Sequence, residues 1–158
     1  MVEKFMEIAL SEARLAEKEE EIPVGAVIVC NGEVIAKAHN MREQLKDPTA
    51  HAEILAIRKA AKTLGDWRLS NCEIYVTLEP CPMCASAILL ARIPKIYFGA
   101  YDFENGACGS KMNIPITFPV FGYKAEVVGG IMKDQCRKVL QEFFKKRRNR
   151  YNKKRRDG

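Results

Sequence analysis

Apolar positions along the chain recur at two spacings, one typical of helices and one typical of buried strands. Residues 2–19 carry apolar side chains every three or four positions among Glu and Lys, which predicts an amphipathic helix. Similar patterns predict further helices over 50–63, 82–91 and 133–146. Short runs rich in apolar and β-branched residues predict strands over 24–29, 33–39, 73–78, 95–100 and 125–130.

Turn-forming residues separate these elements. Asn31-Gly32 lies between the first two strands and predicts a two-residue hairpin, because both residue types tolerate positive φ. Gly65 is expected to end the second helix, and Pro94 follows the third. Residues 40–48 and 101–123 lack a clear period and are predicted to be loops.

The order of elements predicts the fold class. One hairpin combined with strand–helix–strand units favours an α/β fold, a mixed sheet with helices on both faces. With 158 residues, the chain has the length of one domain and can bury a sizeable core. Functional sites in such sheets lie at the carboxyl ends of strands, where loops lead into helix N-termini.

Two functional side chains fall at one such helix start. His51 and Glu53 are two residues apart, and a helix turns about 100° per residue, so the two side chains cannot share a lateral face. They can converge beyond the helix tip if Thr49 caps the helix and both lie in its first turn. Considered alone, His51 would be an ordinary histidine and Glu53 a solvated acid of the first turn.

A second helix start carries two cysteines. Cys81 and Cys84 are three residues apart and share one side of a first turn, which Pro82 suits because its missing N–H needs no partner there. Two sulfurs and one nitrogen at two helix tips match zinc, and three protein ligands leave a position for water, as in catalytic sites. The other readings are a redox pair, buried structural thiols, or a closed structural site with His39 as fourth ligand.

Composition and charge narrow the classes of protein. The N-terminus is rich in acids and is not expected to be a secretory signal, and no stretch approaches the roughly 18 apolar residues of a membrane span. We therefore expect a cytoplasmic protein. Nine of the 26 Lys and Arg, but one of the 20 Asp and Glu, lie in 145–158, so residues 1–144 carry 17 basic and 19 acidic residues. The net charge of +6 is a property of this basic run, which suits a polyanion or a solvated chain end.

Combined, H-A-E at 51–53 and P-C-P-M-C at 80–84 form the zinc deaminase signature. The chain resembles the bacterial tRNA-specific adenosine deaminases over most of its length. The resemblance includes EIPVGAVIV (21–29), AHN (38–40), DPTAHAEILAIRKAA (47–61), IYVTLEPC (74–81), MCASAILLARI (83–93), FGAYD (98–102) and FFKKRR (143–148).

The resemblance implies a cytidine deaminase-like three-layer α/β/α sandwich with a mixed five-stranded sheet, forming a homodimer. Residues 1–146 would be the catalytic domain and 147–158 a basic tail. The run after Arg148 is longer and more basic than the resemblance requires, and it is expected either to be disordered or to contact RNA. The implied reaction is hydrolytic deamination of adenosine to inosine at the wobble position of tRNA. Zn²⁺ on His51, Cys81 and Cys84 would activate a water, and Glu53 would shuttle protons.

The resemblance also implies contacts with the tRNA anticodon stem-loop. Asn40 would hydrogen-bond the flipped base, the backbone at Ala52 would read its edge, and Asp102 would contact the ribose. Residues expected to contact RNA at the end of the chain are Phe144, Lys145 and Arg147. Residues 112–127 lack the Asn-His pair that such proteins usually carry before the last strand, so contacts in 110–124 are not transferred.

Two rival functions use the same motifs. A small-molecule zinc deaminase acting on cytosine, cytidine, deoxycytidylate or guanine would need the same zinc and glutamate, but gains nothing from nine cations at one end. A non-catalytic, zinc-stabilised RNA-binding module would have no use for Glu53 beside an open position.

Overall fold

The structure is a computed structural model of residues 1–158, and it describes residues 1–117 and 122–158. Its strands are β1 (Gly25–Cys30), β2 (Glu33–His39), β3 (Cys72–Leu78), β4 (Lys95–Ala100) and β5 (Glu126–Val128). Its helices are α1 (Val2–Lys18), α2 (Arg42–Leu45), α3 (Ala52–Leu64), α4 (Pro82–Leu90), α5 (Ile114–Thr117) and α6 (Lys133–Asp157). The short helices α2 and α5 lie within the two predicted loops, and residues 118–121 of the second loop lie outside the described residues.

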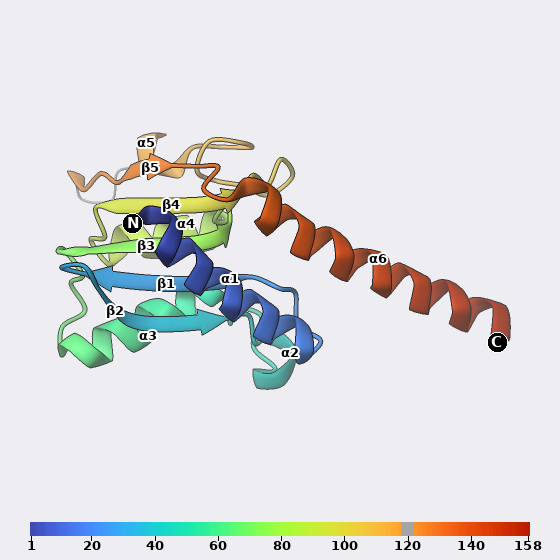
Figure 1. Ribbon diagram of the computed structural model, residues 1–158. Helices are drawn as coiled ribbons and strands as arrows, with labels where there is room; N and C mark the ends of the chain where they lie inside the picture. The colour runs from blue at the N-terminus through green and yellow to red at the C-terminus, as the bar shows by residue number, and fades with distance from the viewer. Residues whose placement is uncertain (118–121) are drawn as a thin grey trace.

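The strands form one mixed sheet in the order β2-β1-β3-β4-β5. β1 pairs antiparallel with β2 and β3, while β3, β4 and β5 run parallel. The predicted hairpin is confirmed, since Asn31 and Gly32 have φ of 52° and 81°. The parallel strands β3 and β4 bring the segments that follow them to the same edge of the sheet (Figure 1).

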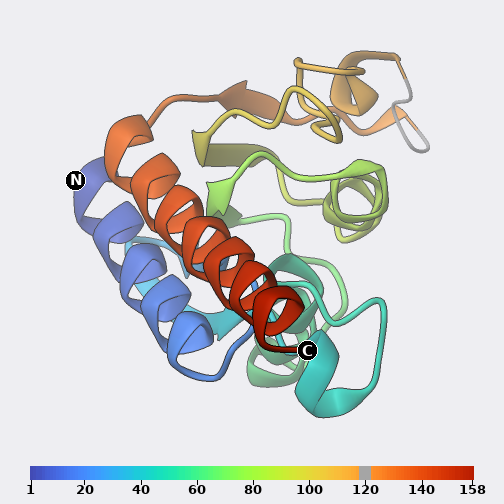
Figure 2. The ribbon, with the colours of Figure 1, turned by 90° about the vertical axis from the view of Figure 1, so that its right-hand side faces the viewer.

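Helices cover both faces of the sheet, as the element order predicted. In Figure 2, α1 and α6 lie side by side on one face, with α3 and α4 on the other. Alternate residues of each strand enter two separate cores, so Ile74 packs with the α3–α4 side and Tyr75 with the α1–α6 side. The three-layer α/β/α sandwich with a mixed five-stranded sheet is therefore confirmed.

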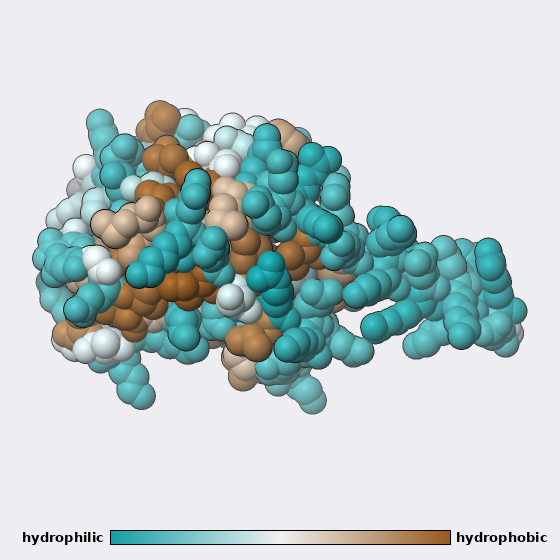
Figure 3. Space-filling model, in the orientation of Figure 1, coloured by the Kyte–Doolittle hydropathy of each residue, from teal (hydrophilic) through white to brown (hydrophobic). Residues whose placement is uncertain are grey.

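The last helix is longer than the sequence pattern predicted. α6 continues from the expected end near residue 146 to Asp157, and it projects well beyond the sheet (Figure 1). Its projecting end is hydrophilic on the face drawn in Figure 3. Lys and Arg are good helix formers and residues 146–157 contain no Gly or Pro, so no local signal stops the helix there.

Among the described residues, no helix combines the length and the apolar character needed to cross a membrane.

Candidate metal centre and active site

Two helix tips meet at the carboxyl edge of the sheet. α3 begins directly after His51, which is its N-cap residue, and α4 begins directly after Cys81. The predicted cap was wrong: the backbone N–H and the hydroxyl of Thr49 both bond Asp47 Oδ1, at 2.8 and 2.7 Å. This local turn takes Thr49 out of the helix, which moves the tip two residues along to His51.

The tips bring together the three predicted metal ligands. His51 Nδ1 lies 3.7 Å from Cys81 Sγ and 3.5 Å from Cys84 Sγ, and the three ligand atoms all lie within 4.8 Å of one another. In a tetrahedral zinc site with ordinary bond lengths, a nitrogen and a sulfur ligand lie about 3.6 Å apart. The donor set and its spacing therefore fit Zn²⁺.

Electrostatics at the tips favour a thiolate and a charged imidazole. The hydrogen bond from Cys84 lowers the pKa of Cys81 to about 4 against the opposing effect of burial, and His51 lowers it further. The same contact, with burial, raises the pKa of Cys84, while the hydrogen bond to Cys81 raises that of His51. Without a metal, Cys81 is therefore the thiolate and Cys84 keeps its proton. A divalent cation would stabilise both cysteines as thiolates.

Glu53 lies beside this triangle and is almost wholly buried, with 4% of its surface exposed. Burial raises the pKa of its carboxyl to about 7, because the charged form loses its hydration. A carboxyl that titrates near neutral pH can both accept and donate a proton under working conditions.

The alternative with His39 as a fourth ligand does not fit. His39 Nε2 lies 2.9 Å from Glu19 Oε2, and its Nδ1 lies 3.7 Å from Glu12 Oε2. Among the described residues, the one group of side chains placed to hold a metal is His51, Cys81 and Cys84. Three protein ligands would leave one position of a bound zinc open to water.

A pocket of about 680 Å³ opens over the site. Its walls include six of the predicted site residues: Asn40, His51, Glu53, Cys81, Asp102 and Phe144. Cys84 lies behind them and is fully buried. Lys145 and Arg147 are not among its lining residues.

Asn40 and Ala52 contact each other directly. The Ala52 N–H donates a 2.7 Å hydrogen bond to Asn40 Oδ1, and both residues are buried. This bond fixes the orientation of the Asn40 amide at the pocket wall and leaves its NH₂ group for another acceptor. The Ala52 N–H is therefore already paired with Asn40, and the expected contact of the Ala52 backbone with the base stays a prediction.

Sequence reasoning missed Glu79, which organises the loop around Asp102. This buried carboxylate accepts hydrogen bonds from the backbone N–H groups of Asp102, Cys108 and Ser110, at 3.2, 3.1 and 3.0 Å, and from the Ser110 hydroxyl. A side chain at Gly106 would collide with the Glu79 carboxylate, so glycine is required there. The available signal was an acid at the end of a buried strand, directly before the Pro-Cys motif.

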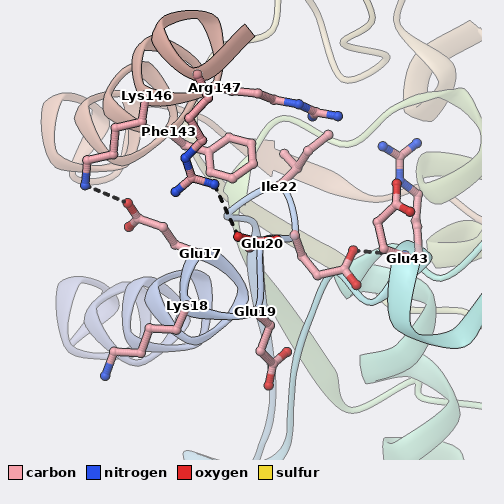
Figure 4. Close-up of a pocket in the computed structure, with 12 residues that line it drawn as sticks. Glu17, Lys18, Glu19, Glu20, Ile22, Glu43, Phe143, Lys146 and Arg147 are labelled. Atoms are coloured by element: carbon pink, nitrogen blue, oxygen red, sulfur yellow. Dashed lines mark hydrogen bonds and ion pairs between the residues drawn. The ribbon is translucent and has the colours of Figure 1, made fainter. Parts of the chain in front are cut away.

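A second pocket, of about 690 Å³, separates the end of α1 from α6 and α2 (Figure 4). Lys146 pairs with Glu17 at 3.7 Å and Arg150 with Glu20 at 3.2 Å. Arg147 lines this pocket rather than the one over Glu53. Glu21, which is buried, accepts hydrogen bonds from the backbone N–H groups of Glu43 and Gln44 at 3.1 and 2.9 Å and so anchors α2.

Comparisons with known proteins agree with this geometry. The model of the cytidine and deoxycytidylate deaminase zinc-binding region matches residues 1–100. A tRNA-specific adenosine deaminase of Bacillus subtilis is 47% identical over 94% of this chain and 91% of its own length, and one from Aquifex aeolicus is 47% identical over 93% and 96%.

Solved structures give the same result. One from a study of A-to-I editing by tRNA:A34 deaminases at the wobble position of transfer RNA has a TM-score of 0.83 and 44% identity, covering 87% of this chain and 99% of that one. A guanine deaminase from Bacillus subtilis has a TM-score of 0.60 and 44% identity, covering 63% of this chain and 64% of that one. The chain is a zinc deaminase-type protein and belongs to the family of the tRNA-specific adenosine deaminases.

Proposed function

We propose that this protein deaminates adenosine to inosine at the wobble position of tRNA. The observation that supports this most directly is the triangle of His51, Cys81 and Cys84 beside the buried Glu53, in a pocket whose rim includes Phe144 of the basic helix α6. The reaction consumes one water and releases ammonia.

The side chains of His51, Cys81 and Cys84 would hold the metal, and Glu53 would move the protons. Bound Zn²⁺ supplies the Lewis acidity that makes a water nucleophilic near neutral pH. Glu53 would accept a proton from the attacking water and deliver it to the ring nitrogen of adenine. It would then move the remaining proton of the new C6 hydroxyl to the amine, which leaves as ammonia as the C6 carbonyl forms. Burial of Glu53 supports this role, because it raises the pKa of the carboxyl to about 7.

The target base enters the pocket from a single-stranded loop. A base inside a duplex cannot reach a buried acid, so the substrate is an unpaired nucleotide of the anticodon stem-loop. The NH₂ group of Asn40 is free to donate to the base, and Asp102 lies at the pocket wall where the ribose would follow. Lys145 and Arg147 lie outside this pocket, so we assign them to phosphates of the stem.

Guanine deamination is the second candidate, because a guanine deaminase is 44% identical over 63% of the chain. The likeness to the tRNA:A34 deaminase extends over more of both chains and has the higher TM-score. The cations of α6 also favour a polyanionic substrate. If the substrate is tRNA, the protein works in the cytoplasm, where tRNA is found.

A homodimer belongs to the same proposal. Leu90 on α4 is 50% exposed and Ile116 on α5, a helix that contacts α4, is 73% exposed, so both helices carry uncovered apolar side chains that a second copy could cover. Sedimentation should give twice the mass of the chain, and Leu90→Asp should shift it to the monomer. A monomer before substitution would contradict the dimer.

The function is tested with four substrates. The zinc-loaded protein is incubated with a tRNA bearing adenosine at the wobble position, with free adenosine, with cytidine and with guanine, and the products are identified by mass. We expect inosine in the tRNA alone. A matched tRNA with guanosine at the wobble position is the control, and xanthine from guanine with unchanged tRNA would favour the second candidate.

A further inference from the structure

Two thiols lie opposite each other at one end of the sheet. Cys30 is the last residue of β1 and Cys72 the first residue of β3, and the two strands pair antiparallel with these residues in register. The end of β1 and the start of β3 lie at the edge of the sheet that faces away from α6 (Figure 1). Both cysteines are free, and neither has a part in the proposed reaction.

The register brings the two sulfurs within bonding reach. Residues directly opposite in an antiparallel pair have Cα atoms about 4.5 or about 5.5 Å apart, and a disulfide spans Cα atoms roughly 4.4–6.8 Å apart. Opposed residues also point to the same face of the sheet. Here this is the α3–α4 face, because Cys72 belongs to its core and Cys30 packs against that core. The two strands therefore need no new register to be joined.

The two thiols differ in their access to solvent. Cys72 is 1% exposed, whereas Cys30 is half-buried. Burial, together with the hydrogen bond between the two thiols, raises the pKa of Cys72 to about 12. A buried, protonated thiol reacts slowly with reagents from solution. Cys30 is therefore the sulfur that an oxidant reaches first, and Cys72 is the thiol placed to react with it afterwards.

We propose that Cys30 and Cys72 form a reversible disulfide when the protein meets hydrogen peroxide. The Cys30 thiolate attacks one peroxide oxygen, the O–O bond breaks, and a sulfenic acid forms as the other oxygen leaves as water. Cys72, as the thiolate, attacks the oxidised sulfur and releases the second water as the S–S bond forms. Two thiols are thus oxidised by two electrons while one peroxide is reduced to two waters. A small thiol reverses the step by exchange.

The bond would close the chain between residues 30 and 72. This segment carries Asn40, His51 and Glu53, and a cross-link across it lowers the entropy of the unfolded chain. The metal ligands lie beyond the opposite end of β3, a strand about 20 Å long, so the bond would leave their geometry unchanged. The pair is thus a staple that stabilises the fold under oxidising conditions, which is a property beyond the proposed function.

The test uses the full-length, zinc-loaded protein. It is treated with hydrogen peroxide, alkylated without reduction and digested, and the peptides are identified by mass. We expect the peptide with Cys30 joined to the peptide with Cys72, and a small thiol should separate them again. The melting temperature should rise by about 10 °C, the effect expected for a closed segment of this length in a chain of this size. The zinc content should stay at one per chain.

Two substitutions remove the accessible sulfur, and a third is the matched control. Cys30→Ser and Cys30→Val keep a small side chain in the strand, one polar and one apolar, so that one of them is expected to fold. Cys136→Ala removes a buried thiol from the other core and keeps the pair. Each protein is compared with its own untreated form, so the cost of the substitution itself cancels. Peroxide should raise the melting temperature of Cys136→Ala and leave that of both Cys30 variants unchanged.

The opposite results would overturn the assignment. They are Cys30 and Cys72 still open to alkylation after peroxide, Cys30 oxidised to the sulfinic acid with no link to Cys72, or a link between Cys81 and Cys84 in its place. A Cys30–Cys72 link without a higher melting temperature would overturn the stabilising role. Deamination is not measured in any of these readings, so a failure of the proposed function would leave the disulfide standing, and the reverse holds as well.

Discussion

At the scale of single residues, the site combines a buried acid with ligands at two helix tips. Burial raises the pKa of Glu53 to about 7, against the smaller opposing effect of His51, and so keeps a proton in reach. Its neighbours His51 and Cys84 form the metal triangle together with Cys81. We therefore assign proton transfer and metal binding to different side chains, and substitutions should separate them.

Glu53→Ala should retain one zinc per chain and lose at least about 10³-fold in kcat, since it removes the group that moves protons and leaves the ligands in place. Metal content is read by elemental analysis and turnover by inosine formation. Glu126→Gln, a surface acid on β5, is the control. An active Glu53→Ala protein would refute the assignment.

Glu79 makes a second separable contribution. Its carboxylate accepts four hydrogen bonds from residues 102–110. In Glu79→Gln one oxygen is replaced by an NH₂ group, which is a donor and cannot accept from these N–H and hydroxyl groups. We expect a loss of about 3 kcal/mol in the free energy of unfolding. We also expect a raised KM, because the loop that carries Asp102 loses its anchor.

Urea unfolding and steady-state kinetics measure the two effects of Glu79→Gln. Glu33→Gln, an exposed acid on β2, provides the comparison. A variant that unfolds and turns over like the unaltered protein would show that the loop is held by other contacts.

The residue scale also separates what the sequence could predict from what it could not. His51, Cys81 and Cys84 were predicted from their spacing, because ligand geometry at a helix tip depends on local sequence. Glu79 was missed, since an acid at a strand end is ordinary until the fold delivers N–H groups from 23 to 31 positions away. The predicted Thr49 cap was wrong because the N–H and hydroxyl of Thr49 both donate to the carboxylate of Asp47, two residues before it.

At the scale of elements, the strands and long helices followed their periodicity, and α6 exceeded it. Apolar spacing ends near residue 146, so the hydrophobic pattern did not predict helix beyond that point. The helix continues to Asp157 because the Lys and Arg residues that follow have a high helix propensity. The result is a charged helix with two kinds of side. One side pairs with acids of α1, and another, which includes Arg137 and Arg148, lines a hollow between α6 and the loop after β4.

The acids of α1 should therefore compete with RNA for α6. The double variant Glu17→Gln and Glu20→Gln removes both partners of the exposed ion pairs, which contribute at most about 1 kcal/mol to stability. We expect thermal unfolding close to the unaltered protein and RNA affinity raised up to about fivefold at low salt.

Fluorescence anisotropy against salt concentration measures this gain, which should disappear as screening increases. Glu3→Gln combined with Glu33→Gln makes the same change in net charge and leaves both ion pairs with α6 in place. If the control pair raises affinity equally, the effect comes from net charge and not from the α1–α6 contact.

At the scale of the whole molecule, the metal site lies on a fold that has its own core. Buried residues fill both faces of the sheet, from Met6 and Leu10 on the α1 side to Ile88 and Ile96 on the α4 side. Small zinc domains unfold without metal because the metal supplies their folding free energy. Here the two cores form without His51, Cys81 or Cys84. We expect the metal to order only the two helix tips that carry these ligands.

Removing zinc should therefore abolish activity while the fold survives. After chelation we expect an unchanged far-ultraviolet circular dichroism spectrum and a melting temperature lowered by several degrees, because a ligand that binds only the folded state stabilises it by mass action. Added Zn²⁺ should restore both properties, whereas Mg²⁺ should restore neither, since thiolate ligands select soft metals. A chelated protein that still forms inosine at the original rate would mean that the site at the two helix tips is not the catalytic centre.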